Sequence, residues 1–155
     1  YVVLDVDVPI GKIKINCVIA IHDSGKILNR ALASAQVHGG VAMGIGYALT
    51  EQMLFDPETG KMRNDNLLDY KIPTAMDIPQ IDVEFVETYE PSAPFGNKAL
   101  GEPPMIPQAP AIRNAVLHAT GVAVYELPLT PERLIHAFIQ AGLIQPLSCE
   151  HIAET

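Results

Sequence analysis

Two segments of the chain, Tyr1–Val8 and Ile81–Glu87, alternate apolar and polar residues, which is typical of strands that bury one face. Ile13–Ile21 is rich in β-branched residues and is also predicted as a strand. A shorter apolar segment, Val122–Leu127, is predicted as a fourth strand. Asp56–Gly60 has the composition of a tight turn and predicts a hairpin between two short flanking strands.

Three further segments carry helix signals. The longest is Ala33–Glu51, and the second is Pro110–Thr120, which Gly121 is expected to terminate. Thr130 is expected to cap a third helix, and Gly142 to end it. Strands and helices mix without the regular alternation of a doubly wound sheet, so the pattern predicts an α+β fold with a mixed sheet and packed helices.

Composition narrows the classes of protein that remain. The chain has 155 residues, 18% of them charged, and a formal net charge of −8. A negative charge without a basic stretch argues against binding to nucleic acid or to an anionic membrane. The low charge leaves two interpretations open, a well-packed single domain or a surface buried against other protein. Because the chain begins at Tyr1 and not at Met, we expect that a preceding segment was removed or left out.

Metal-binding and charged side chains exclude some chemistry. Cys17 and Cys149 are too few for a four-cysteine iron–sulfur cluster, and the five histidines lack metal-ligand spacing. A metal site built by the protein is therefore not expected.

The stretch Glu51–Glu90 carries ten acidic and three basic residues and is expected to form a solvated acidic face.

The first predicted helix contains four glycines, Gly39, Gly40, Gly44 and Gly46. Their spacing fails as a phosphate loop, because Ile45 stands where a lysine is needed. It also lacks the third glycine of a dinucleotide fingerprint. A glycine in a helix interior destabilises the helix by about 1 kcal/mol relative to alanine, so four of them in one helix require an explanation. Two explanations remain open: close packing of the helix, or backbone N–H groups that approach an anionic ligand.

The segment Gly96–Pro104, with the sequence GNKALGEPP, is the most informative part of the chain. Pro103 disfavours a helical conformation at Glu102, so the carboxylate lies on a short and stiff segment. Such rigidity suits a positioned general base. A solvent-facing glutamate in a proline-rich loop is the alternative.

This segment resembles the G-[ST]-K-[AG]-x-G-E-P-P signature of the molybdenum hydroxylases, the xanthine dehydrogenase and aldehyde oxidase family. Gln36–Gly40, Tyr70–Pro73 and Thr130–Arg133 resemble other motifs of that family in order and spacing. The resemblance implies that residues 1–142 are the C-terminal portion of a molybdopterin-binding domain of the large subunit, followed by a tail at 143–155.

The resemblance also implies a reaction. Glu102 would take the proton from a molybdenum-bound hydroxyl, whose water-derived oxygen attacks a carbon of an N-heterocycle while a hydride passes to a sulfido group. Desolvation beside the metal is expected to strengthen this base. Gln36 would hydrogen-bond the pterin. The residues expected to lie at the cofactor are Gln36, Gly39, Gly40, Lys98, Ala99 and Gly101, and no protein side chain is expected to bind the metal.

The implied cofactor is molybdenum–molybdopterin, including a form with a cytosine dinucleotide. The [2Fe–2S] clusters and FAD would lie on other domains or subunits of a cytoplasmic oligomer, and the isolated chain would be inactive. Lys98 has a second interpretation as the ion-pair partner of a nearby acid. Aldehydes, nicotinate or an aromatic thioester would fit the same chain as substrates. A different class also remains, a non-catalytic interaction domain that retained the fold.

Overall fold

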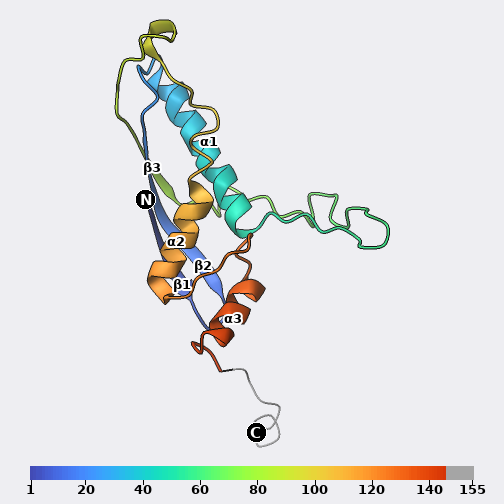
Figure 1. Ribbon diagram of the computed structural model, residues 1–155. Coiled ribbons are helices and arrows are strands. Elements are labelled where there is room, and N and C mark those ends of the chain that lie inside the picture. The colour runs from blue at the N-terminus through green and yellow to red at the C-terminus, as the bar shows by residue number, and fades with distance from the viewer. Residues whose placement is uncertain (146–155) are drawn as a thin grey trace, which may run out of the picture.

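The computed structural model describes residues 1–145. It has three strands, three α-helices and one short 3-10 helix (Figure 1). In chain order these are β1 (Val2–Asp7), β2 (Lys12–His22), α1 (Arg30–Leu49), β3 (Gln80–Phe85), η1 (Pro94–Gly96), α2 (Gln108–Thr120) and α3 (Pro131–Gln140). The predicted α+β class and mixed sheet are confirmed.

The sheet has the order β1-β2-β3, with β1 antiparallel and β3 parallel to β2. A bulge interrupts the first pairing, because Val3 lies opposite Cys17 whereas Leu4 lies opposite Ile15. The extra residue changes the phase of the alternation along β2. As a result, side chains on both sides of the bulge, such as Ile15 and Val18, contribute to the same apolar core.

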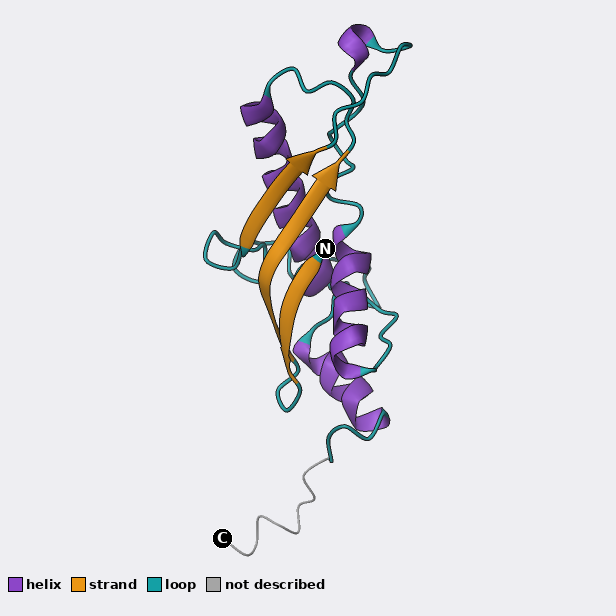
Figure 2. Cartoon of the chain, turned by 90° about the vertical axis from the view of Figure 1, so that its left-hand side faces the viewer, coloured by secondary structure: helices purple, strands orange, loops and turns teal. Residues whose placement is uncertain are grey.

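The helices cover one face of the sheet, as Figure 2 shows. Helix α1 packs over β3, α2 packs over β1 and against α1, and α3 contacts β2. The buried core residues come from β2, the three helices and the segment before α3: Val18, Ala20, Val37, Val41, Ile45, Ala48, Ala109, Ile112, Val116, Leu129, Leu134 and Phe138. The core therefore fixes α1 relative to the sheet and to α2.

The ends of the helices follow local capping chemistry. Helix α1 begins at Arg30 because the Asn29 side chain accepts a hydrogen bond from the Leu32 amide at 3.1 Å. The predicted stop at Gly121 is confirmed, with this residue in the left-handed conformation at φ 73°. The predicted cap at Thr130 is also confirmed, since its hydroxyl accepts from the Arg133 amide at 3.3 Å.

Two strand predictions are wrong. Residues Val122–Leu127 form no strand, because the Val124 carbonyl accepts a hydrogen bond from the Arg113 guanidinium and not from a neighbouring strand. The apolar side chains of this segment pack onto the core without a ladder. The hairpin predicted around Asp56–Gly60 is reduced to one bridge between Phe55 and Met62.

The long connection between α1 and β3 projects away from the body of the molecule (Figure 1). Within residues 1–145, no helix is both long and apolar enough to cross a membrane. The predicted tail at 143–155 lies largely outside the described residues. Its start is tied to α3, because the Leu143 amide donates to the Phe138 carbonyl at 2.9 Å.

Candidate functional site

The two segments that carry the predicted site lie side by side, although 65 residues separate them in sequence. The Gln36 Nε2 on α1 donates to the Gly101 carbonyl at 3.1 Å. In Figure 1 the chain between η1 and α2 runs along the N-terminal half of α1. Gln36, Gly101 and Glu102 are all exposed at this junction.

Two of the helix glycines allow this close approach. A Cβ atom on Gly40 would lie 2.7 Å from the Cβ of Pro104, and one on Gly44 would lie 2.5 Å from the Cβ of Gln108. Both distances are shorter than real side-chain contacts, so larger residues would push the two segments apart. Close packing, one of the two interpretations left open, therefore explains these positions. The position that a side chain of Gly40 would occupy lies against Pro104.

The motif Tyr70–Pro73 meets the other end of α1. A Cβ on Gly46 would lie 2.8 Å from Pro73 Cδ. The Tyr70 hydroxyl donates to Glu51 Oε2 at 2.8 Å. This hydrogen bond to the carboxylate raises the pKa of Tyr70. The motif thus anchors the projecting connection to α1, away from the junction with Gly101.

Gly39 and Gly101 differ from the packed glycines. A Cβ built on either would meet nothing within 4 Å, and both residues are exposed. The surface at these two positions therefore has room for a ligand beside the amide of Gln36, which both donates and accepts hydrogen bonds. The amide and the space beside it fit the polar edge of a pterin.

Glu102 lies outside any helix, with its side chain exposed, and its carbonyl accepts from the Met105 amide at 2.9 Å. Two residues later Pro104 is fully buried, and its carbonyl accepts from the buried Gln108 Nε2 at 3.0 Å. The segment is thus anchored directly after the carboxylate. The desolvation that the resemblance implies for Glu102 is not found among residues 1–145, where this side chain is exposed.

Lys98 is engaged in an ion pair. Its Nζ lies 2.8 Å from Asp23 Oδ2, which matches the second interpretation of this lysine. The hydrogen bond from Lys98, together with those from Thr88 and the Gly25 amide, lowers the pKa of Asp23 to about 2. Ala99, the next residue, is exposed.

Sequence reasoning missed Asp23 and Thr88 as parts of this region. Asp23-Ser24-Gly25 has the composition of a turn, but nothing local shows that its carboxylate would reach Lys98, 75 residues later. The side-chain contact of Thr88 with Asp23 joins residues that are 65 positions apart in sequence. The pairing of β2 with β3 brings Thr88 close to Asp23, and the bridge between Gly25 and Asn97 brings Lys98 there.

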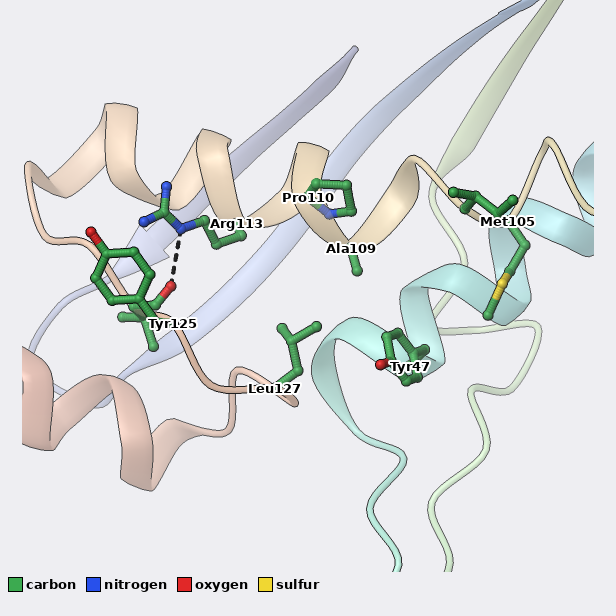
Figure 3. A pocket seen from close by; sticks show the side chains of 9 residues that line it. Tyr47, Met105, Ala109, Pro110, Arg113, Tyr125 and Leu127 are labelled. Atoms are coloured by element: carbon green, nitrogen blue, oxygen red, sulfur yellow. Dashed lines mark hydrogen bonds between the residues drawn. The ribbon is translucent and has the colours of Figure 1, made fainter.

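A separate apolar pocket of about 510 Å³ lies between α1, α2 and the segment before α3 (Figure 3). Its lining includes Tyr47, Met105, Arg113 and Tyr125. The Arg113 guanidinium lies 4.8 Å from the centre of the Tyr125 ring. Glu102 and the predicted cofactor residues do not line this pocket, so it is distinct from the junction described above.

Comparisons with known proteins agree with the motifs. The profile of the molybdopterin cofactor-binding domain family matches residues 1–79. The xanthine dehydrogenase molybdenum-binding subunit of Escherichia coli O157:H7 is 57% identical over 144 residues, which are 93% of this chain and 19% of that protein. The nicotine 6-hydroxylase large subunit of Paenarthrobacter nicotinovorans is 34% identical, over 87% of this chain and 17% of its own length.

A solved structure has the same fold. Quinoline 2-oxidoreductase from Pseudomonas putida 86 superposes with a TM-score of 0.82 and 32% identity, covering 88% of this chain and 18% of that chain. The chain therefore spans about a fifth of the length of the relatives that it matches. It belongs to the molybdopterin cofactor-binding domain family and corresponds to a part of a molybdenum hydroxylase large subunit.

Proposed function

We propose that this chain is the C-terminal portion of the molybdenum-binding subunit of a hydroxylase that acts on an N-heterocycle. The observation that carries the proposal is the contact between Gln36 and Gly101, which joins two separate family motifs beside Glu102. Residues 1–142 would form part of the molybdopterin-binding domain.

The names of these three relatives favour N-heterocycles, whereas other relatives of similar identity, such as the 35% identical aldehyde oxidoreductase subunit PaoC of Escherichia coli (strain K12), are named for aldehydes. Xanthine, nicotine and quinoline are all N-heterocycles, in which ring nitrogens make a neighbouring carbon electron-poor. Hydroxylation of such a carbon consumes water and releases two protons and two electrons. The electrons would leave through [2Fe–2S] and FAD centres on other domains or subunits. The cytosine dinucleotide form of the cofactor, the cytoplasmic location and the oligomeric state stay predictions.

Each predicted residue has a defined part in this proposal. The bound molybdenum cofactor supplies the two-electron oxidation, with water as the source of the inserted oxygen. The Glu102 carboxylate accepts the proton that this oxygen loses as it attacks the substrate carbon. The Gln36 amide would hydrogen-bond the pterin edge, and the absence of side chains at Gly39 and Gly101 would leave room for it. Gly40, Lys98 and Ala99 would contribute mainly by fixing the backbone that faces it.

The test is Glu102→Gln in the full-length enzyme with all its subunits. The amide keeps the size of the side chain but cannot accept the proton. We expect turnover to fall by about 10²- to 10⁴-fold, the usual contribution of a general base, with the molybdenum content unchanged. The measurement is steady-state turnover of a purine or a simple N-heterocycle, together with metal analysis of the same sample.

Glu87→Gln is the matched control, because Glu87 is also an exposed glutamate but lies on the segment after β3. This variant should keep its turnover. If Glu102→Gln retained near-normal turnover at normal molybdenum content, the proposed base would be wrong and a non-catalytic role would be favoured.

A further inference from the structure

The Asp23 carboxylate ties together three parts of the chain. Its Oδ1 accepts from the Gly25 amide at 3.1 Å and from the Thr88 hydroxyl at 2.6 Å. Its Oδ2 accepts from Lys98 Nζ at 2.8 Å. One side chain therefore joins the turn after β2, the segment after β3 and the Gly96–Pro104 segment.

Backbone contacts interlock the same parts. The Lys98 amide donates to the Ser24 carbonyl at 2.8 Å, and the Lys26 amide donates to the Gly96 carbonyl at 2.9 Å. Gly25 has φ 66°, and a Cβ there would collide with the Gly96 carbonyl oxygen. Only a glycine fits this approach without strain. The start of the segment is thus fixed against the turn that carries Asp23.

The end of the segment is fixed independently. Gln36 holds the Gly101 carbonyl, and Pro104 is buried against Gly40. Between these two anchors the chain runs from Lys98 to Glu102 with exposed residues at most positions. The position of Glu102 therefore depends on both anchors.

We infer that Asp23 is a positioning residue, which through Lys98 holds the segment that presents Glu102. This inference rests on the proposed function of Glu102. The Lys98 and Asp23 side chains are 37% and 44% exposed, and exposed ion pairs contribute little to global stability. A displacement of about 1 Å at a catalytic group, in contrast, can cost on the order of 10²-fold in rate. The contact matters for geometry more than for folding.

The test is Asp23→Asn in the full-length enzyme. Asparagine still offers an oxygen to Gly25 and Thr88 but loses the attraction to Lys98. We expect kcat to fall by up to about 100-fold, with KM, molybdenum content and melting temperature nearly unchanged. Hydrogen exchange of the peptide that contains Asn97–Gly101 should become faster.

Asp56→Asn is the matched control. Asp56 also accepts backbone hydrogen bonds, from Glu58 and Thr59, and pairs with Arg63 at 2.7 Å, but it lies on the projecting connection. This variant should change neither kcat nor exchange at the Asn97–Gly101 peptide. Lys98→Met removes the same pair from the other side, and the double variant with Asp23→Asn should lose no more kcat than the single ones.

Three outcomes overturn the inference: unchanged kcat and exchange in Asp23→Asn, losses that only follow molybdenum content, or fully additive losses in the double variant. The Glu102→Gln variant, measured in parallel, separates this inference from the proposed function. If Glu102→Gln loses turnover while Asp23→Asn does not, Asp23 has no positioning role. If Glu102→Gln keeps turnover, the proposed base fails, and the exchange data still show whether Asp23 fixes the segment.

Discussion

Neighbouring residues of the Gly96–Pro104 segment have opposite surroundings. Glu102 is exposed, whereas Pro104 is fully buried and its carbonyl is bound by Gln108. A buried proline has a fixed φ and no backbone donor to satisfy, so it makes a rigid anchor. The Glu102 carboxylate, the proposed base, gains a defined position from Pro104, a nearby residue that carries no chemistry of its own.

The way in which stability against unfolding falls at acid pH tests whether the charge of Asp23 stabilises the fold. Its pKa of about 2 lies below the value of about 4 in an unfolded chain, so the charged form stabilises the fold above pH 4. This contribution is lost as the pH falls from about 4 to about 2. Because the Asp23 side chain is 44% exposed, we expect the urea midpoint of the wild-type enzyme to exceed that of Asp23→Asn only slightly at pH 5 to 6, with a difference that shrinks below pH 4. Urea titrations at each pH measure it.

The prediction for Asp23 fails if the wild-type and Asp23→Asn enzymes respond to pH in the same way. Asparagine cannot titrate, so the urea midpoints of the two enzymes must converge at low pH if the ion pair with Lys98 persists in the intact enzyme. A constant difference between pH 3 and pH 6 would show that the charge of Asp23 is not stabilised by its partners there.

At the scale of elements, α1 presents three distinct faces. Val37, Val41 and Ile45 recur every four residues and lie in the core. Gly40 and Gly44 form a second face, against the segment that begins α2. A third face carries Gln36, Gly39 and exposed apolar side chains such as Met43. One helix therefore links the core to the candidate site.

A pair of adjacent glycines tests this arrangement. In Gly40→Ala the new methyl meets Pro104, so we expect a loss of about 1–3 kcal/mol in stability, typical of overpacking. In Gly39→Ala the methyl meets no protein atom, and the gain in helix propensity is about 0.5–1 kcal/mol. Urea midpoints of the full-length subunit should therefore fall in Gly40→Ala and rise in Gly39→Ala.

The molybdenum content of the Gly39→Ala variant tests whether Gly39 belongs to the cofactor site. If the Gly39 backbone contacts the pterin, Gly39→Ala should lower the molybdenum content although it does not lower stability. Normal molybdenum content in Gly39→Ala would remove Gly39 from the candidate site. A stable Gly40→Ala would contradict the packing against Pro104.

Sequence patterns predicted these elements to the extent that their causes are local. Alternation and capping located β1, β2, β3 and all three helices within a few residues. The strand predicted at Val122–Leu127 failed because strand formation needs a partner, and a partner is a property of the tertiary structure. The same holds for Lys98, whose pairing with Asp23 depends on the order of the sheet, and for the glycines, whose two interpretations only the packing of α1 separates.

At the scale of the whole molecule, much apolar surface faces outward. Large apolar side chains such as Leu32, Met43 and Tyr47 on α1, and Tyr125 beside the apolar pocket, are more than half exposed. Contiguous exposed apolar surface usually marks an interface. The low fraction of charged residues has the same implication. We therefore expect this chain to function covered by further protein.

Analysis of native material tests that expectation together with the proposed function. We expect molybdenum to purify with this sequence, either within a polypeptide much larger than 16.8 kDa or beside co-purifying subunits that carry iron–sulfur and flavin groups. The measurements are intact mass of every chain and metal analysis of the same sample. Within residues 1–145, the candidate site offers a pterin the Gln36 amide and the space beside Gly39 and Gly101, so we expect most cofactor contacts to come from other protein. A chain of 16.8 kDa that purifies alone and without molybdenum would favour the interaction domain and leave Glu102 as an ordinary surface carboxylate.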